Sequence, residues 1–168
     1  MTTFQVDQNL HDRDFAAECE AGGSAKVWLF PKNLRHEPDE KILPILMARS
    51  NPLVTMDRDI AQDHPKSIPN KNPGIVVVGF AKGNAKSITI KNVKTILAQF
   101  KRLFPRWANT NLDGSILEIT PESVEVWHVH DNTVIEDVYL PFSADKWTDQ
   151  LMEVLDTNSR RSNKAIPE

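Results

Sequence analysis

The chain has 168 residues, 40% of them hydrophobic and 26% charged, and its formal net charge is −3. This balance is typical of one soluble globular domain, and it excludes a protein that binds nucleic acid or membranes through a strongly basic overall charge. The single cysteine, Cys19, excludes a disulfide within the chain. No N-terminal apolar leader and no run of about 18 apolar residues is evident, so we expect a cytoplasmic protein outside the membrane.

The first half of the sequence alternates between short apolar runs and amphipathic stretches. The apolar runs predict three strands, at residues 4–6, 26–30 and 53–55. Apolar residues at helical spacing predict helices over 11–21 and 39–49, and Asp39 is the expected N-cap of the second helix. Residues 63–73 hold three prolines and few apolar side chains, so we expect a loop there.

The second half continues with a long apolar run and then a hairpin pattern. Four further strands are predicted, at residues 74–80, 115–119, 124–129 and 133–140. Asp131-Asn132 is the predicted turn between the last two strands. Helices are expected over 89–104 and 143–155, with Ser143 capping the second, and the polar residues 156–168 are expected to fray.

The alternation of strands and helices predicts an α/β fold with three layers and a mainly parallel central sheet. The predicted hairpin and last helix form a C-terminal extension of this sheet. We therefore expect one compact unit, with a main domain over residues 1–122 and an extension over residues 123–168 packed on it.

Five carboxylates stand where the predicted strands end or the next helix begins. Asp7 follows the first strand, Asp57 and Asp59 follow the third, and Asp39 and Glu40 open the helix after the second. Because ligands of such sheets bind at the carboxyl ends of the strands, these acids are expected along one edge. Carboxylates held together repel one another unless a cation joins them, and carboxylate oxygens are ligands that Mg²⁺ and Mn²⁺ prefer.

The residues alone leave simpler explanations open. Asp39 could serve only as an N-cap, and Glu40 only as a favourable charge at a helix start. Asp7 is followed by Gln8 and Asn9, which disfavours a receiver domain, because that domain needs a pair of acids after its first strand.

Four stretches in order, "VDQNL", "PDEKILPIL", "LVTMDRDI" and "PGIVVV", resemble a PIN-like nuclease domain. The resemblance covers roughly residues 4–80 and is closest to the small PIN-like toxins of bacterial toxin–antitoxin modules. It implies a three-layer PIN-like fold and a Mg²⁺- or Mn²⁺-dependent endoribonuclease. The alternative is a PIN-like scaffold without catalysis that binds a protein or RNA partner.

The resemblance also implies roles for individual residues. The expected catalytic residues are Asp7, Asp39, Glu40, Asp57 and Asp59, and the expected metal ligands are Asp7, Glu40, Asp57 and Asp59. The expected supporting residues are Thr55 and Asn9, and the residues expected to bind the substrate are Arg58 and Arg35. RNA and a protein antitoxin are the implied partners, and a homodimer is an open option.

Two further features lie outside this resemblance. His128 and His130 alternate along a predicted strand and therefore share one of its faces, which we expect to be exposed. Arg160 and Arg161 lie in the predicted polar tail and could contact RNA or a partner, or have no role.

Overall fold

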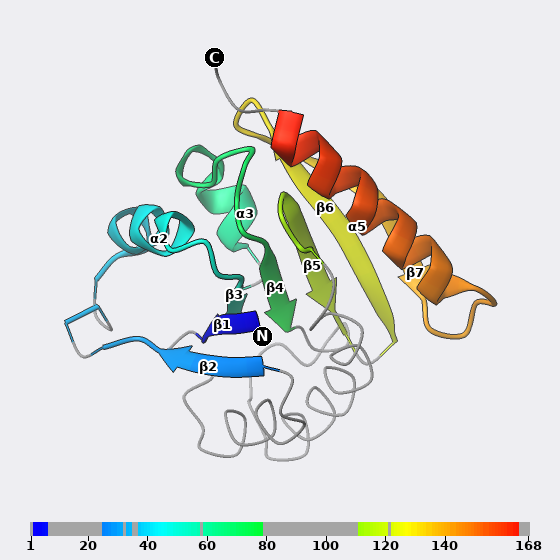
Figure 1. The fold of residues 1–168 in the computed structure, drawn as a ribbon, viewed down its shortest axis with the longest axis horizontal. Coiled ribbons are helices and arrows are strands. Elements are labelled where there is room, and N and C mark those ends of the chain that lie inside the picture. The colour runs from blue at the N-terminus through cyan, green and yellow to red at the C-terminus, as the bar shows by residue number, and fades with distance from the viewer. Residues whose placement is uncertain are drawn as a thin grey trace.

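The structure, a computed structural model, describes residues 2–6, 25–31, 33–34, 37–57, 59–78, 111–120 and 122–164. These residues form one seven-stranded sheet with helices packed against it (Figure 1). The strands are β1 (Thr2–Val6), β2 (Ala25–Leu29), β3 (Leu53–Thr55), β4 (Ile75–Val78), β5 (Ser115–Ile119), β6 (Ser123–His130) and β7 (Thr133–Pro141). The described helices are α2 (Asp39–Ala48), α3 (Ile60–Asp63), the 3-10 helix η2 (Pro65–Ser67) and α5 (Trp147–Lys164).

The strand order is β2-β1-β3-β4-β5-β6-β7, and the first five strands of this order are parallel. The chain passes from β1 out to β2 and returns on the other side of β1 as β3. Such a reversal of strand order marks the crevice where open α/β sheets bind ligands, at the carboxyl ends of the two strands. Val6 of β1 pairs with Val54 of β3, so these two strands end at the same edge.

Apolar side chains of the central strands are buried on both faces of the sheet. Leu53 and Ile75 contribute to a core that includes α2 and α3, whereas their neighbours Val54 and Val76 contribute to a second core that includes α5. Successive strand residues point to opposite faces, which explains why these strands are continuous apolar runs. Figure 1 shows α5 running along β6 and β7.

The antiparallel hairpin extends the same sheet. β6 pairs with β5 on one side and with β7 on the other, both in antiparallel orientation. Asp131 and Asn132 connect the two strands with φ angles of 50° and 63°. Two successive residues of positive φ match the two-residue turn that suits the twist of a hairpin, as the Asp-Asn pair predicts.

The α/β class and the mostly parallel sheet confirm the coarse expectation from sequence. The seven strands and the helix at 39–48 are present within a few residues of their predicted bounds. Pro38, rather than Asp39, is the N-cap residue of α2, and it makes no capping side-chain hydrogen bond. The predicted helices over 11–21 and 89–104 lie outside the described residues.

Two predictions for connecting segments are wrong. Residues 63–73 are not wholly a loop, because α3 ends at Asp63 and η2 follows it; Pro65 begins η2, a position where proline's missing N–H is tolerated. The last helix does not begin at Ser143 and fray after Leu155 but runs over Trp147–Lys164. Its final turns carry buried polar residues, which an apolar pattern does not reveal.

Candidate functional site

The candidate site begins where β3 ends. Thr55, the last residue of this strand, is fully buried, and its Oγ1 accepts a hydrogen bond of 3.1 Å from the backbone N–H of Asp57. Oδ1 of Asp57 in turn accepts a hydrogen bond of 3.1 Å from the backbone N–H of Asp59. The threonine and the two aspartates, spaced by one residue each, therefore form a chain of local hydrogen bonds that fixes the turn after the strand.

A second side of the site comes from the start of α2, which a buried glutamine ties to the sheet. Gln5 of β1 is fully buried, and its Nε2 donates hydrogen bonds of 2.8 Å to the carbonyl of Leu46 and 2.7 Å to the carbonyl of Asn51. The bond to Leu46 holds the last turn of α2 against β1, and the bond to Asn51 holds the segment that follows this helix.

Burial and neighbouring carboxylates perturb the titration of Asp57. Burial is the largest cause that raises the pKa of the Asp57 carboxyl above its usual value. The hydrogen bond from the Asp59 backbone lowers this pKa, whereas the negative charges of Asp39, Asp59 and Asp63 raise it further. The ionised form of Asp57 is therefore disfavoured by burial and by like charge, the situation that a bound cation relieves.

Asp39 and Glu40 differ in their relation to this cluster. Asp39 is the acid of the pair whose charge acts on Asp57, and its side chain is 45% exposed. Glu40 is exposed on the helix surface. The charges of Asp39, Asp59 and Asp63 thus act on Asp57, and Asp57 and Asp59 follow directly after β3.

His64 is a neighbour of this cluster that the sequence analysis missed. Its Nε2 lies 3.6 Å from Oδ2 of Asp39, and its side chain is 19% exposed. His64 follows α3 in the chain, whereas Asp39 opens α2, so only the packing of the two helices on one face of the sheet brings the two residues together. A histidine next to a proline carries no sequence signal for such a contact.

Four predicted site residues belong to segments that the structure does not describe. Asp7, Asn9, Arg35 and Arg58 lie outside the described residues. Within the described ranges, no three His, Cys, Asp or Glu side chains form a group that could hold a metal ion. The carboxylates that do come together offer oxygen ligands of the kind that Mg²⁺ and Mn²⁺ take, but the described acids alone do not complete a site.

Comparisons with protein-family models, curated proteins and solved structures gave no match for this chain. In the part of the chain that the structure describes, no helix combines the length and the apolar character needed to cross a membrane.

Proposed function

We propose that the protein is a Mg²⁺- or Mn²⁺-dependent endoribonuclease with a PIN-like fold. The observation that carries this proposal is the environment of Asp57 just after β3, where burial and the negative charges of Asp39, Asp59 and Asp63 raise the pKa of its carboxyl. The strand order supports the proposal, because Asp57 follows β3 and the order reverses between β1 and β3, which is the usual ligand position in open α/β sheets. The ordered motifs that resemble PIN-like domains support the same chemistry.

Each residue has a proposed role in this site. Asp39, Asp57 and Asp59 would hold the cation together with Asp7, which directly follows Val6 of β1 in the sequence. When bound, such a cation polarises a phosphoryl oxygen and lowers the pKa of a bound water. Thr55 fixes the backbone of Asp57 through the hydrogen bond to its N–H, and so orients the carboxylate toward the cluster.

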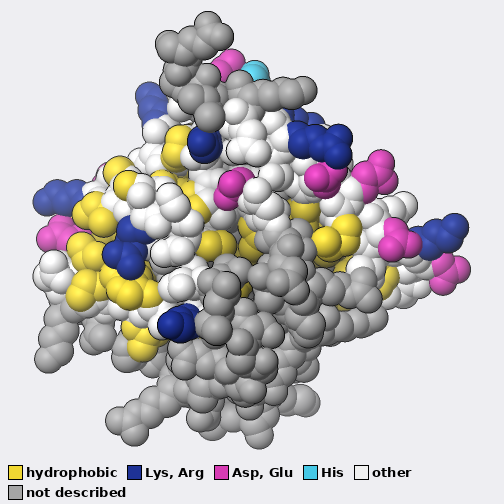
Figure 2. All heavy atoms as spheres, viewed as in Figure 1, with side chains coloured by type: hydrophobic (Ala, Val, Ile, Leu, Met, Phe, Trp, Pro, Cys, Tyr) yellow, Lys and Arg dark blue, Asp and Glu magenta, His cyan; other side chains and the backbone are white. Residues whose placement is uncertain are grey.

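RNA is the proposed substrate, and a protein antitoxin is the proposed restraint. RNA binding needs local positive charge to meet the phosphates. Figure 2 shows acidic and basic side chains of the described residues interspersed over one face of the molecule, without a broad basic area. We therefore expect that binding of RNA depends strongly on the cation at the acidic edge, and that a partner with a basic side chain could block the same edge.

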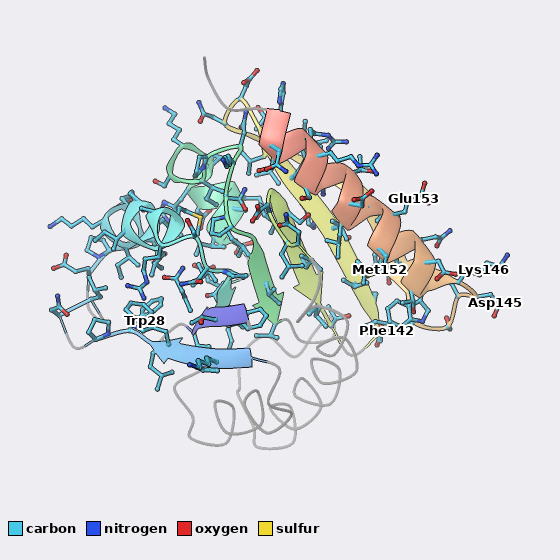
Figure 3. The ribbon with its side chains drawn as sticks, viewed as in Figure 1. Trp28, Phe142, Asp145, Lys146, Met152 and Glu153 are labelled. Carbon is cyan, nitrogen blue, oxygen red and sulfur yellow. The ribbon has the colours of Figure 1, made fainter. Side chains whose placement is uncertain are left out.

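The test is cleavage of a fluorescent single-stranded RNA in Mn²⁺ or Mg²⁺, with and without a chelator. We expect cleavage that the chelator abolishes, and a loss of at least about a hundredfold in Asp57→Asn and Asp39→Asn, because removing one group that stabilises transition-state charge costs on this order. The matched control is Asp145→Asn, the same chemical change at an exposed acid just before α5 (Figure 3). Absence of cleavage with either cation, while the protein still binds RNA or a co-purified partner, would support the scaffold without catalysis.

A further inference from the structure

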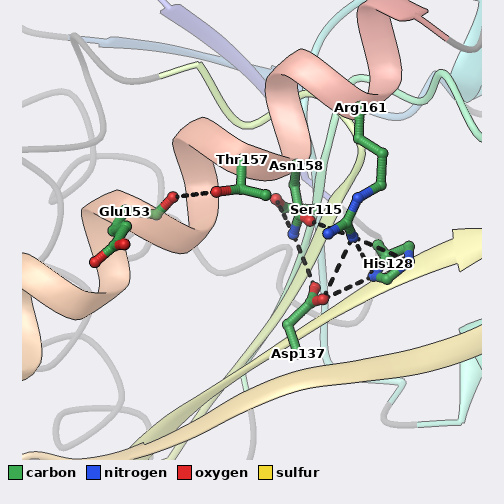
Figure 4. A network of polar contacts seen from close by, with 7 residues as sticks. All are labelled: Ser115, His128, Asp137, Glu153, Thr157, Asn158 and Arg161. Carbon is green, nitrogen blue, oxygen red and sulfur yellow. Dashed lines mark hydrogen bonds and ion pairs between the residues drawn. The ribbon is translucent and has the colours of Figure 1, made fainter.

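A second polar cluster lies on the opposite face of the sheet from α2, between α5 and strands β5 to β7 (Figure 4). Asn158 of α5 is 1% exposed and donates from Nδ2 to Oγ of Ser115, at 3.1 Å, and to Oδ2 of Asp137, at 2.9 Å. Nδ1 of His128 lies 2.9 Å from Oδ1 of Asp137, and both side chains are 12% exposed. His128 is thus held inside this cluster, and the expectation that its strand face is exposed is wrong for this residue.

The acceptors of this cluster are all engaged. Both oxygens of Asp137 accept hydrogen bonds, and Oδ1 of Asn158 accepts one of 3.0 Å from Nη1 of Arg161. Nη1 of Arg161 also lies 2.9 Å from Nδ1 and 3.0 Å from Nε2 of His128, and 3.5 Å from Oδ1 of Asp137. Every polar contact that Arg161 makes with the described residues uses Nη1, and Nε and Nη2 of its guanidinium meet no acceptor among these residues.

A small pocket opens beside this cluster, with a volume of about 20 Å³. Its lining includes Asn70, His128, Asn158, Arg161 and Ser162, and no carboxylate is among the described residues that line it. One water-sized atom takes about 10–15 Å³ by this measure, so the pocket admits one or two oxygen atoms.

Two of the lining side chains carry donor groups, the Ser162 hydroxyl and the Asn70 NH₂, that have no acceptor among the described residues. Ser162 is 2% exposed, and its Oγ has no hydrogen-bond partner among the described residues. Oδ1 of Asn70 accepts a hydrogen bond of 3.3 Å from the backbone N–H of Asp131, so the NH₂ group of this amide is turned away from that bond. A buried hydroxyl without a partner is unfavourable, which makes an external acceptor favourable.

The turn before β5 approaches α5 closely beside the pocket. Gly114 has φ +77°, and a Cβ at this position would lie 2.9 Å from Cβ of Ser162 and 3.1 Å from the carbonyl oxygen of Asn158. Only glycine lets the turn before β5 come this near to α5. At Gly114, the backbone next to Ser162 therefore leaves no room for a side chain.

We propose that this pocket binds the terminal oxygens of a phosphoryl group, either from free phosphate or from a phosphomonoester. Arg161, Ser162 and Asn70 supply donors from two separate segments, and a guanidinium beside neutral donors is the arrangement that oxyanions prefer. The acids nearby are already paired, Asp137 with His128 at 2.9 Å and with Nη1 of Arg161 at 3.5 Å, and Asp131 with His130 at 3.3 Å. This site lies on the other face of the sheet from the α2 and α3 core and does not depend on the proposed nuclease activity.

Calorimetric titration with inorganic phosphate, with a nucleoside monophosphate and with the corresponding nucleoside tests this site. We expect binding of the two phosphorylated probes and none of the nucleoside. Tighter binding of the monophosphate than of phosphate would identify a phosphomonoester as the ligand. Arg161→Gln is expected to raise the dissociation constant for phosphate by about tenfold or more, which is the effect of losing one charge-assisted contact. The matched control, Arg160→Gln, removes the same charge from the neighbouring residue, whose Nη2 pairs with Asp156 at 2.8 Å, and should change the constant less than about twofold.

Ser162→Ala keeps the test decisive if Arg161→Gln does not fold, because it removes only a buried hydroxyl. We expect this variant to bind phosphate more weakly and to melt at the same temperature as the wild type or higher. Absence of phosphate binding would mean that the pocket holds only water and would overturn the proposal. Equal weakening by Arg160→Gln and Arg161→Gln would also overturn it, since binding would then follow overall charge.

Discussion

Replacing Asp57 by asparagine should stabilise the protein in the absence of divalent cations. The charges of Asp39, Asp59 and Asp63 all disfavour the ionised Asp57. Asp57 is only half-buried, so solvent screens these repulsions, and each is worth about 0.2–0.5 kcal/mol. Asparagine keeps Oδ1, which accepts the Asp59 N–H, so the local turn is retained. The sum is an increase of roughly 1 kcal/mol in the free energy of unfolding, or about 2–4 °C in melting temperature for a chain of this size.

The gain in stability from Asp57→Asn should decrease as the pH falls. The folded-state pKa of Asp57 is raised, so the folded protein binds this proton more tightly than the unfolded chain does. The penalty from ionised Asp57 is therefore fully present at neutral pH and disappears as the pH falls through the raised pKa. The difference in stability between Asp57→Asn and the wild type should be largest near pH 7. It should disappear as the pH falls to about 4, near the usual pKa of an aspartate.

Thermal and urea unfolding of both proteins, with a chelator and across this pH range, provides the measurement. Asp145→Asn is the control for the loss of one negative charge and should show no such pH-dependent gain. Asp57→Ala separates charge from hydrogen bonding, since it removes the acceptor for Asp59 and should be less stable than Asp57→Asn by about 0.5–1.5 kcal/mol. A loss of 1 kcal/mol or more in Asp57→Asn would refute the reasoning, because it would show that the carboxylate makes a stabilising ion pair.

Four further outcomes are expected. Millimolar Mn²⁺ should raise the melting temperature of the wild type but not that of Asp57→Asn; an equal rise in both would place the cation elsewhere. Thr55→Val should lower the free energy of urea unfolding by about 1–3 kcal/mol, because the N–H of Asp57 loses its acceptor, and Thr55→Ser should lose less. Gly114→Ala should cost more than about 1 kcal/mol in the same assay, given its positive φ and the 2.9 Å approach to Ser162; a neutral effect would show that α5 can move away from the turn. Asn158→Leu should cost about 2 kcal/mol or more, since Ser115 and Asp137 lose a donor, and an unchanged stability would mean that water replaces the amide.

The central strands could be predicted because their signals are local. Leu53-Val54 and Ile75 to Val78 are continuous apolar runs, and burial on both faces of a parallel sheet favours this pattern. Asp57 and Asp59 could be placed at a strand end for the same reason. The position of a strand end in a parallel sheet then fixes the edge at which these acids lie.

Other features depend on contacts between segments far apart in the sequence. His64 meets Asp39 only because α2 and α3 pack on the same face of the sheet. The last turns of α5 bury Asn158 and Ser162. From the sequence alone, polar residues at these positions predict an exposed tail. α3 spans four residues, which is too short for helical periodicity to appear.

The buried amide of Asn158 also determines how α5 is aligned along the sheet. Apolar contacts such as those of Leu151 and Leu155 are non-directional and would tolerate a slip of the helix by one turn, or about 5.4 Å. After such a slip, Ser115 and Asp137 would remain buried while their shared donor was displaced, at a cost of about 1–3 kcal/mol for each group. The polar cluster therefore selects a single register among several that the apolar stripe alone would allow, and the hairpin and the last helix fold against each other in one alignment.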